Sequence, residues 1–468
     1  MFKIRNLYIA AIFLAFLFLW TRFYKIDTSL LFFNDIGRDF LTLWKWQESG
    51  KPPLLGPQTS ALPFNQSAVY FYLLYPFYLL TSHSPYASLI ACSLFYVLSF
   101  FVGLYYLREY PRLEKSLLLV FLLIIVHPQY IIQGRFIWNP SFVTPFILTA
   151  FYSLVVYLEQ KKPKNILLIL SAFSIALATA FSYSTVPTLL AFLVLIIFRD
   201  RKKFFPYFSY IVLALFIVNL PTIFFELRHD FLLSKMMLFG DRIDQGNNYL
   251  FARLINLSKF SFAIDWRIVV IYLLFLILFF YSSLKKEKNR FLNAGGLLLF
   301  LTVFLTALMP ISVHSHYIFG ILPLLFLTIS FLRTRYIYMT GVFFYIIFMQ
   351  AALNENYFAK ARNTVAELQN CAQIFCSKKI GPIFISNQSS HHPYHNAMEF
   401  QYFMSEAGCD VRNINEGSDQ ASKMAVILDD DSYNHGKTAF YELTLFGKST
   451  EKERIACKDK LEIVLLEK

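Results

Sequence analysis

The feature that most constrains this chain is a series of apolar runs, separated by short clusters of lysine and arginine. The runs are roughly 17 to 25 residues long, which is the length that an α-helix needs to cross the hydrocarbon core of a bilayer. No soluble core could bury so much apolar surface, because 57% of the 468 residues are hydrophobic and only 16% are charged. The sequence therefore predicts a polytopic α-helical membrane protein.

We count about eleven predicted spans. They lie near residues 7–22, 86–107, 116–132, 141–158, 165–181, 184–198, 205–225, 266–284, 292–309, 315–332 and 336–352. The first run follows Lys3 and Arg5, as in a signal peptide, but no small-residue cleavage site comes after it. We therefore predict an uncleaved anchor.

The basic clusters between the spans predict the orientation, because basic loops stay in the cytoplasm. If the short apolar segment 67–80 is an interfacial or re-entrant segment, every basic cluster is cytoplasmic; if it spans, all but the first lie outside. The clusters are Lys3/Arg5, Arg108/Arg112/Lys115, Lys161/Lys162/Lys164, Arg199/Arg201/Lys202/Lys203, Lys285/Lys286/Lys288/Arg290 and Arg333/Arg335. The net charge of +13 thus reflects membrane topology and predicts no nucleic-acid partner.

This orientation places the N-terminus in the cytoplasm and the chemistry on the opposite, exocytoplasmic face. On that face lie the loop 23–85, the turn 133–140, the loop 226–265 and all residues after about 353. The chain is then expected to have a membrane domain at 1–352 and an exocytoplasmic domain at 353–468.

The C-terminal domain is predicted to be a small soluble α/β domain. Helical patterns near 359–374 and 396–407 alternate with apolar runs at 382–386, 424–428 and 462–466. Four cysteines lie in this domain: Cys371, Cys376, Cys409 and Cys457. They predict one or two disulfides, with three pairings open, or else buried free thiols. Cys92 falls within a span and is expected to pack there.

Two polar runs of this domain raise the question of a metal site. His391, His392 and His395 form the sequence HHPYH, and an acidic triplet occupies 429–431. The histidine spacing matches no recognised site, and an acidic triplet after a strand is usually a solvated turn. A divalent metal remains open as a cofactor.

The first external loop carries the clearest candidates for chemistry. Asp35, Arg38 and Asp39 lie one helical turn apart, just beyond the first span, with spacings that put them on one helix face. Charged groups at an apolar boundary are costly, which favours a functional role. The structural alternative is a juxtamembrane helix that begins at Asp35, with Arg38 reaching to the interface.

The motifs around these residues resemble the bacterial family 39-type membrane glycosyltransferases, which are related to protein O-mannosyltransferases and lipid A aminoarabinose transferases. The matching strings are NDIGRDF at 34–40, LLGPQTS at 54–60, RFIWNPSFVTP at 135–145, PTIFFELRHDF at 221–231 and HSHYIFGILPLLF at 314–326. The resemblance covers most of residues 1–352 and implies a GT-C fold, in which an aromatic segment such as 67–80 is a juxtamembrane helix.

The resemblance also implies a polyprenyl-phosphate sugar donor and transfer on the outer face of the bacterial cytoplasmic membrane. It implies that Asp35 acts as base or positions the acceptor, with Arg38 as the arginine of the Asp-x-x-Arg pattern. Relatives commonly have an Asp-Glu pair here, whereas Ile36 follows Asp35, so that Asp39 is a candidate for the second acid.

A leaving lipid phosphate gathers negative charge and calls for cationic or hydrogen-bonding side chains. The candidates map to the outer ends of predicted spans: Arg38, Arg135, Arg228, His316 and Tyr317. Arg135 and Arg228 could instead be interfacial anchors, and one of His314 and His316 could cap or pack.

We therefore expect a hexosyl- or pentosyltransferase of glycan or lipopolysaccharide biosynthesis in the cell envelope, whose acceptor is a glycan, a lipid or a protein. The first alternative is a flippase or transporter of lipid-linked saccharides, which should carry mid-span charges or paired halves. The second is an enzyme like the O-antigen ligases, against which the Asp-x-x-Arg pattern argues.

Overall fold

The computed structural model describes residues 2–59, 65–239, 250–262, 290–309, 313–331, 357–389, 395–429 and 440–468. The chain divides into two compact units. The membrane unit comprises Met1–Tyr24, Pro53–Leu80 and Tyr86–Tyr357, and the sheet unit comprises Lys25–Pro52, Thr81–Pro85 and Phe358–Lys468. The sheet unit thus includes two segments of the loop 23–85, which the expected boundary near 353 had grouped with the membrane domain.

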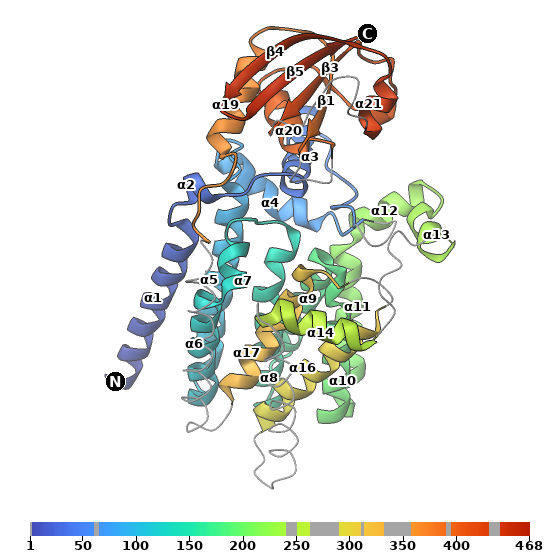
Figure 1. Cartoon of the computed structure of the whole chain (residues 1–468). Coiled ribbons are helices and arrows are strands. Elements are labelled where there is room, and N and C mark those ends of the chain that lie inside the picture. The colour runs from blue at the N-terminus through green and yellow to red at the C-terminus, as the bar shows by residue number, and fades with distance from the viewer. Residues whose placement is uncertain are drawn as a thin grey trace. The chain divides into compact units, whose positions relative to one another are not determined.

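The membrane unit is a bundle of helices (Figure 1). In the described residues its α-helices are α1 (Phe2–Phe23), α4 (Val69–Leu80), α5 (Ala87–Leu107), α6 (Pro111–Val126), α7 (Pro128–Gln133), α8 (Val143–Glu159), α9 (Asn165–Phe181), α10 (Val186–Arg199), α11 (Phe204–Val218), α12 (Leu220–Arg228), α13 (Leu232–Phe239), α14 (Leu250–Phe262), α16 (Arg290–Leu308) and α17 (Leu322–Ser330). Short 3-10 turns join several of them: η1 (Asn139–Phe142), η2 (Tyr183–Thr185), η3 (Arg201–Lys203) and η4 (Ser315–Gly320).

Among the described helices, two are long and apolar enough by themselves to cross a bilayer, Ala87–Leu107 and Asn139–Glu159. The pair Arg201–Val218 and Leu220–Arg228 passes the same test as one span bent by 64°. The predicted spans 266–284 and 336–352 lie outside the described residues, so the total of about eleven stays a prediction. The segment 67–80 contains α4, a helix of 12 residues, which is shorter than a span.

Prolines interrupt two of the predicted spans. The run 116–132 ends as α6 at Val126 and resumes at Pro128 as α7, where the His127 side chain accepts a hydrogen bond from the Gln129 N–H at 3.2 Å. The run 205–225 breaks at Asn219, before Pro221 in the first turn of α12. Proline has no N–H to continue a helix and clashes with the preceding turn, so both breaks have a local cause.

Hydrogen bonds between helices fix how the helices of the bundle pack, because burial of apolar side chains alone does not select one register over another. The Ser171 hydroxyl on α9 donates to the Ala150 carbonyl on α8 at 2.8 Å, and it lies 3.0 Å from the Tyr207 hydroxyl on α11. All three residues are buried. One small polar side chain therefore fixes the register of three neighbouring helices.

The sheet unit contains a five-stranded mixed sheet of order β2-β1-β3-β5-β4. Its strands are β1 (Ile383–Gln388), β2 (Val411–Arg412), β3 (Lys423–Leu428), β4 (Thr450–Lys458) and β5 (Leu461–Glu467). β2, β1 and β3 run parallel, whereas β5 is antiparallel to both β3 and β4. The three predicted apolar runs are β1, β3 and β5, which are the central strands.

Both faces of this sheet are covered. Met424, Val426 and Leu428 on β3 pack with Phe440 and with Phe446 of α21 (Tyr441–Phe446) on one face. The alternate residues of β3 and β5 are also buried, as expected for side chains that alternate across a covered sheet. Figure 1 shows α19 (Val365–Cys376) and α20 (Met398–Glu406) packed against the sheet.

Helix α19 begins six residues later than the pattern at 359–374 predicted, because a capping box fixes its start. The Thr364 hydroxyl accepts from the Glu367 N–H, and the Glu367 carboxylate accepts from the Thr364 N–H at 2.8 Å. This reciprocal pair satisfies two backbone donors that a helix start leaves open.

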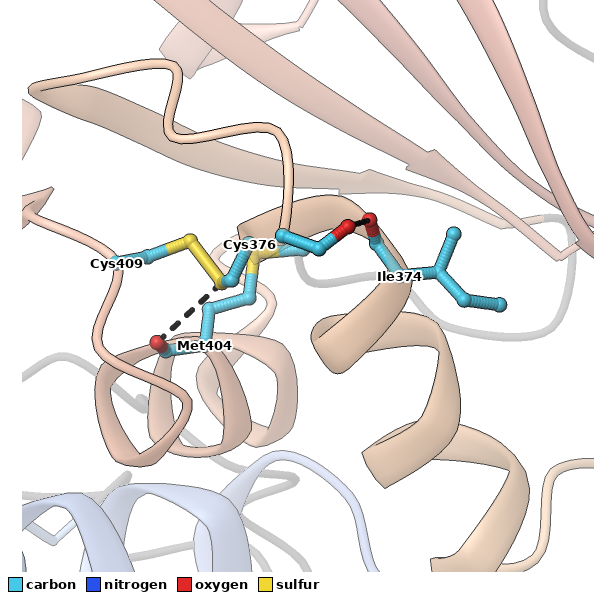
Figure 2. The surroundings of a disulfide bond; sticks show 5 residues. Ile374, Cys376, Met404 and Cys409 are labelled. Atoms are coloured by element: carbon cyan, nitrogen blue, oxygen red, sulfur yellow. Dashed lines mark hydrogen bonds between the residues drawn. A yellow bond between two sulfur atoms is a disulfide. The ribbon is translucent and has the colours of Figure 1, made fainter.

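Two disulfides cross-link the unit, which confirms the prediction and selects one of the three pairings. Cys371 on α19 pairs with Cys457 on β4, with 5.0 Å between their Cα atoms, and Cys376 pairs with Cys409, with 5.4 Å. Figure 2 shows the second bond, with Met404 of α20 beside it. The disulfides thus tie α19 to edge strand β4 and to the short segment after α20 that contains Cys409. Cys92 is a buried free thiol in α5.

Candidate functional site

The candidate residues of the first loop, Asp35, Arg38 and Asp39, lie on a helix of the sheet unit, α3 (Asp35–Ser49). Asp35 occupies its first turn, where a carboxylate interacts favourably with the helix dipole, and Gly50 ends it in a left-handed conformation with φ of 66°. Ile36, Phe40 and Leu43 are buried along one face of the helix. The helix is therefore amphipathic, and it docks by its apolar side.

Arg38 lies between the two aspartates. Its Nη1 donates to Asp35 Oδ1 at 2.7 Å, while its Nε and Nη2 both donate to Asp39 Oδ1, at 3.0 and 2.8 Å. The Asp39 side chain is fully buried, whereas those of Asp35 and Arg38 are 31% and 24% exposed. The structure thus brings the three predicted residues together and distinguishes the two acids by their access to solvent.

Because of this difference in exposure, the two carboxylates are suited to different roles. A fully buried carboxylate is held by its cation, and breaking such a pair is strongly destabilising. Asp35 meets Arg38 by one bond and keeps a solvent-accessible part, so it can reach a hydroxyl of a second molecule. Arg38 fixes the direction of Asp35 and compensates its charge.

A further carboxylate, which the sequence gave no reason to select, belongs to the same group of residues. Glu399 on α20 is 6% exposed, and its Oε2 accepts a hydrogen bond from the Asn34 N–H at 2.9 Å. Burial raises the pKa of Glu399, the bonds from its own N–H and from that of Asn34 oppose this rise, and Asp429 adds to it. Glu399 is 365 residues from Asn34 and matches no motif, so no local signal could have found it.

Aromatic rings surround this contact inside the sheet unit. Phe32 packs against Phe40, Tyr402 and Phe403 with ring centroids 5.1 to 5.8 Å apart, and the Tyr402 hydroxyl donates to the His83 carbonyl. Such ring pairs add about 0.5 to 1.5 kcal/mol each beyond the burial of their area. They hold the beginning of α3 against α20.

In the membrane unit, Arg135 caps a helix. Its Nη1 donates to the carbonyls of Thr21 and Arg22, both at 3.0 Å, and its Nη2 donates to that of Tyr24 at 2.8 Å. These carbonyls close the last turn of α1, where a cation is favourable. Burial, together with neighbouring Arg22, lowers the pKa of Arg135 to about 10, which leaves it cationic at neutral pH. Its direct binding of donor phosphate stays a prediction.

His316 and Tyr317 lie together on η4, within an aromatic group of the membrane unit. The His316 ring is 4.9 Å from that of Trp138 and 4.8 Å from that of Tyr317, measured between centroids. His314 stacks on His316 at 5.7 Å. Trp138 belongs to the string RFIWNPSFVTP, so two of the strings that carried the resemblance meet here. The arrangement offers flat ring faces and hydrogen-bonding nitrogens side by side.

Arg228 is the last residue of α12, and its side chain is exposed. Arg135 and the His316 group lie in other segments of the membrane unit. Its neighbour Glu226 accepts from the N–H groups of Leu233 and Ser234 at 2.8 and 2.9 Å. Glu226 thereby joins α12 to α13. Arg228 keeps the exposure that a ligand for an anion requires.

The two polar runs of the C-terminal domain fall partly outside the described residues, which include neither His391 and His392 nor residues 430–431. His395 holds the end of β1, because its Nδ1 lies 2.7 Å from the Asn387 carbonyl and its ring stacks on Phe440 at 4.5 Å. Asp429 is buried, 3.8 Å from Arg362. Among the described residues, no group of three or more His, Cys, Asp or Glu side chains could hold a metal ion.

Comparisons with known proteins bear on the fold. The sequence matches no family model, and the search of curated proteins gives no match. Two solved structures match with 97% of each chain covered: ArnT from Cupriavidus metallidurans bound to undecaprenyl phosphate, with a TM-score of 0.63 and 10% identity, and the same protein in the apo state, with 0.64 and 11%. The chain has the GT-C fold. Mycobacterial arabinofuranosyltransferase AftD also matches, with a TM-score of 0.48 and 11% identity, over 99% of this chain and 40% of AftD.

The GT-C fold confirms the resemblance seen in the sequence motifs. It also confirms that the chain is a multi-pass helical membrane protein with a small C-terminal domain that contains a sheet. At this level of identity the likeness concerns the fold, so the reaction has to be argued from the residues of this chain.

Proposed function

We propose that this protein is a glycosyltransferase that moves a sugar from a polyprenyl-phosphate donor to an acceptor on the outer face of the bacterial cytoplasmic membrane. The observation that carries the proposal is the Asp35–Arg38–Asp39 group, in which one carboxylate is buried and the other is accessible, on a chain with the GT-C fold. ArnT, which shares this fold, was solved with undecaprenyl phosphate, a lipid of the kind that the proposed reaction releases.

In the proposed reaction, Asp35 is the general base. An acceptor hydroxyl attacks the anomeric carbon, its proton passes to the Asp35 carboxylate, and the bond from that carbon to the phosphate oxygen breaks. The products are the glycosylated acceptor and the polyprenyl phosphate. Arg38 orients Asp35 through the bond at 2.7 Å, and Asp39 anchors Arg38.

The leaving phosphate needs donors that meet its growing charge. We assign this role to Arg38, Arg228, His316 and Tyr317, and retain Arg135 as a further candidate. Trp138 offers an aromatic face beside His316, which suits the apolar face of a sugar ring or an isoprenyl group. Whether a divalent metal takes part is left to the assay below.

The proposed sidedness has support from the cysteines. Two disulfides in the sheet unit are typical of an oxidising compartment, and the same unit contains Asp35. This placement agrees with a cytoplasmic N-terminus, an exocytoplasmic C-terminal domain and basic loops that face the cytoplasm. Reporter fusions at Pro85 and Lys468 test it, and a cytoplasmic signal at Lys468 would contradict it.

The test of the reaction is an assay with purified protein, membrane extract and a panel of radiolabelled polyprenyl-phosphate sugars, with and without EDTA. We expect label to move from one donor to an acceptor of a glycan, lipid or protein class, with release of polyprenyl phosphate. The labelled sugar then shows whether the enzyme is a hexosyl- or a pentosyltransferase. Movement of intact donor across proteoliposomes without transfer would instead indicate a flippase.

A further inference from the structure

A buried side chain of the C-terminal domain binds the turn that leads into Asp35. Glu399, in the first turn of α20, accepts the Asn34 N–H at 2.9 Å, and Asn34 directly precedes Asp35. A polar side chain that is 6% exposed is stable only where hydrogen bonds satisfy it. The position of this carboxylate and the conformation of the turn therefore depend on each other.

The backbone on both sides of this bond is in an unusual conformation. Asn34 has φ of 41° and Ala397, the residue before α20, has φ of 47°, both in the region that non-glycine residues avoid. Conformations of this kind persist only where surrounding contacts hold them. The bond from Asn34 to Glu399 is such a contact.

The two helices also meet more closely than side chains would allow. A Cβ atom built on Gly37 would lie 2.4 Å from the Glu399 nitrogen and 2.6 Å from its Cα atom. The first turn of α3 therefore lies directly on the first turn of α20, and only a glycine at 37 permits this. The Cys376–Cys409 disulfide in turn fixes the chain just after α20 (Figure 2).

We propose that Glu399 is a positioning residue for Asp35, an inference that rests on the proposed function. Its acceptor oxygen holds the Asn34 N–H, and this sets the direction in which α3 starts and presents its first carboxylate. The C-terminal domain is in this way a part of the catalytic apparatus that fixes the base, and Glu399 itself exchanges no proton with the substrate.

The experiment compares Glu399→Ala with Glu399→Gln in the full-length protein. Without its acceptor the partly buried Asn34 N–H is left unsatisfied, so we expect Glu399→Ala to lower kcat by roughly 10- to 100-fold with little change in KM for the donor. Glutamine keeps an acceptor oxygen at the same place, and Glu399→Gln should stay within about threefold of wild type. Glu406→Ala is the matched control, because Glu406 ends the same helix about 10 Å further along.

Hydrogen–deuterium exchange over residues 33–40 provides a readout that needs no substrate. Glu399→Ala should speed exchange there by roughly 10- to 100-fold, while Glu399→Gln and Glu406→Ala should not. Unchanged exchange in Glu399→Ala would overturn the inference. An unchanged kcat in that variant, or a Glu399→Gln variant as inactive as Glu399→Ala, would overturn it too.

These readouts separate the inference from the function on which it rests. If the wild-type protein transfers no sugar, the proposed function fails, yet exchange at 33–40 still reports on the bond between Glu399 and Asn34. If Asp35→Asn is active in the same assay while Glu399→Ala is not, the base is misassigned and Glu399 has no Asp35 to position.

Discussion

Two regions of this molecule hold a buried or half-buried arginine in opposite ways. At the end of α1 in the membrane unit, the Arg135 guanidinium donates to three backbone carbonyls. At the beginning of α3 in the sheet unit, Arg38 donates to two carboxylates instead. The first arrangement completes a helix, while the second holds the carboxylate that we propose as the general base.

The comparison shows that the hydrogen-bond acceptors of a buried or half-buried arginine indicate its role. Carbonyl groups at a helix end accept hydrogen bonds but do not react, so a cation that donates to them stabilises the fold. A carboxylate can accept a proton, and Asp35, which Arg38 binds and leaves 31% exposed, is the carboxylate that we propose as the base. Variants of Asp35 and of Arg135 distinguish these two roles.

Asp35→Asn should lower transfer by roughly 10²- to 10⁴-fold, the usual loss for a general base, with little effect on thermal stability because the amide keeps the shape of the side chain. The measurement is the initial rate of transfer beside a melting curve. Asp39→Asn is the control. It should reduce the melting temperature more and the rate less, because Asp39 is buried against Arg38. The reverse pattern would move the base to Asp39.

Removing the disulfides should destabilise the sheet unit in proportion to the loops that they close. The Cys371–Cys457 bond spans 86 residues and the Cys376–Cys409 bond spans 33. Loop entropy alone gives about 4.6 and about 3.7 kcal/mol, as upper values. Cys371→Ala/Cys457→Ala should therefore unfold at lower denaturant than Cys376→Ala/Cys409→Ala. Equal midpoints would indicate that chain entropy does not govern this unit.

Arg135→Ala should destabilise the membrane unit by about 2 kcal/mol, because three carbonyls at the end of α1 lose a charged donor. We expect a lower melting temperature in detergent, and a donor affinity that changes only as far as folding does. His316→Ala is the contrasting variant, with weaker donor binding and a nearly unchanged melting temperature. A loss of donor affinity at full stability in Arg135→Ala would place this arginine on the phosphate.

The smallest effect concerns Glu367 in the capping box of α19. Burial opposes its ionisation, but bonds from Lys458, from the Thr364 N–H and from Lys360 outweigh this and lower its pKa to about 2. Its stabilisation should therefore be complete above about pH 4.5 and disappear as the pH falls towards 2. We expect Glu367→Gln to cost about 1 kcal/mol at pH 7 and almost nothing near pH 2, in urea unfolding of the full chain. A cost that does not depend on pH would exclude this cause.

Elements whose signal is local could be predicted from the sequence. Within the described residues, the long apolar runs form helices, and the runs at 382–386, 424–428 and 462–466 form the central strands β1, β3 and β5. A helix or a buried strand is specified by residues a few positions apart, which a single sequence displays. The Asp35–Arg38–Asp39 group is of this kind, because its spacing alone puts the three side chains on one turn.

A charged segment that forms a strand could not be predicted from the sequence. β4 carries Glu451, Lys452, Glu453 and Arg454 and looks like a solvated segment, yet it is a strand. It lies at the edge of the sheet, where charged side chains prevent pairing with other chains, so its charge is a consequence of its position.

Which distant residues come together could be learned from the tertiary structure alone. It paired the cysteines, joined residues 25–52 to the C-terminal domain, and placed Glu399 on the N–H of Asn34. The physical reason is that hydropathy and spacing describe the neighbours of a residue along the chain, whereas a hydrogen bond across 365 residues depends on the packing of whole elements. Gly37 illustrates this difference. The sequence shows that residue 37 has no side chain, but it does not show that α20 lies against it.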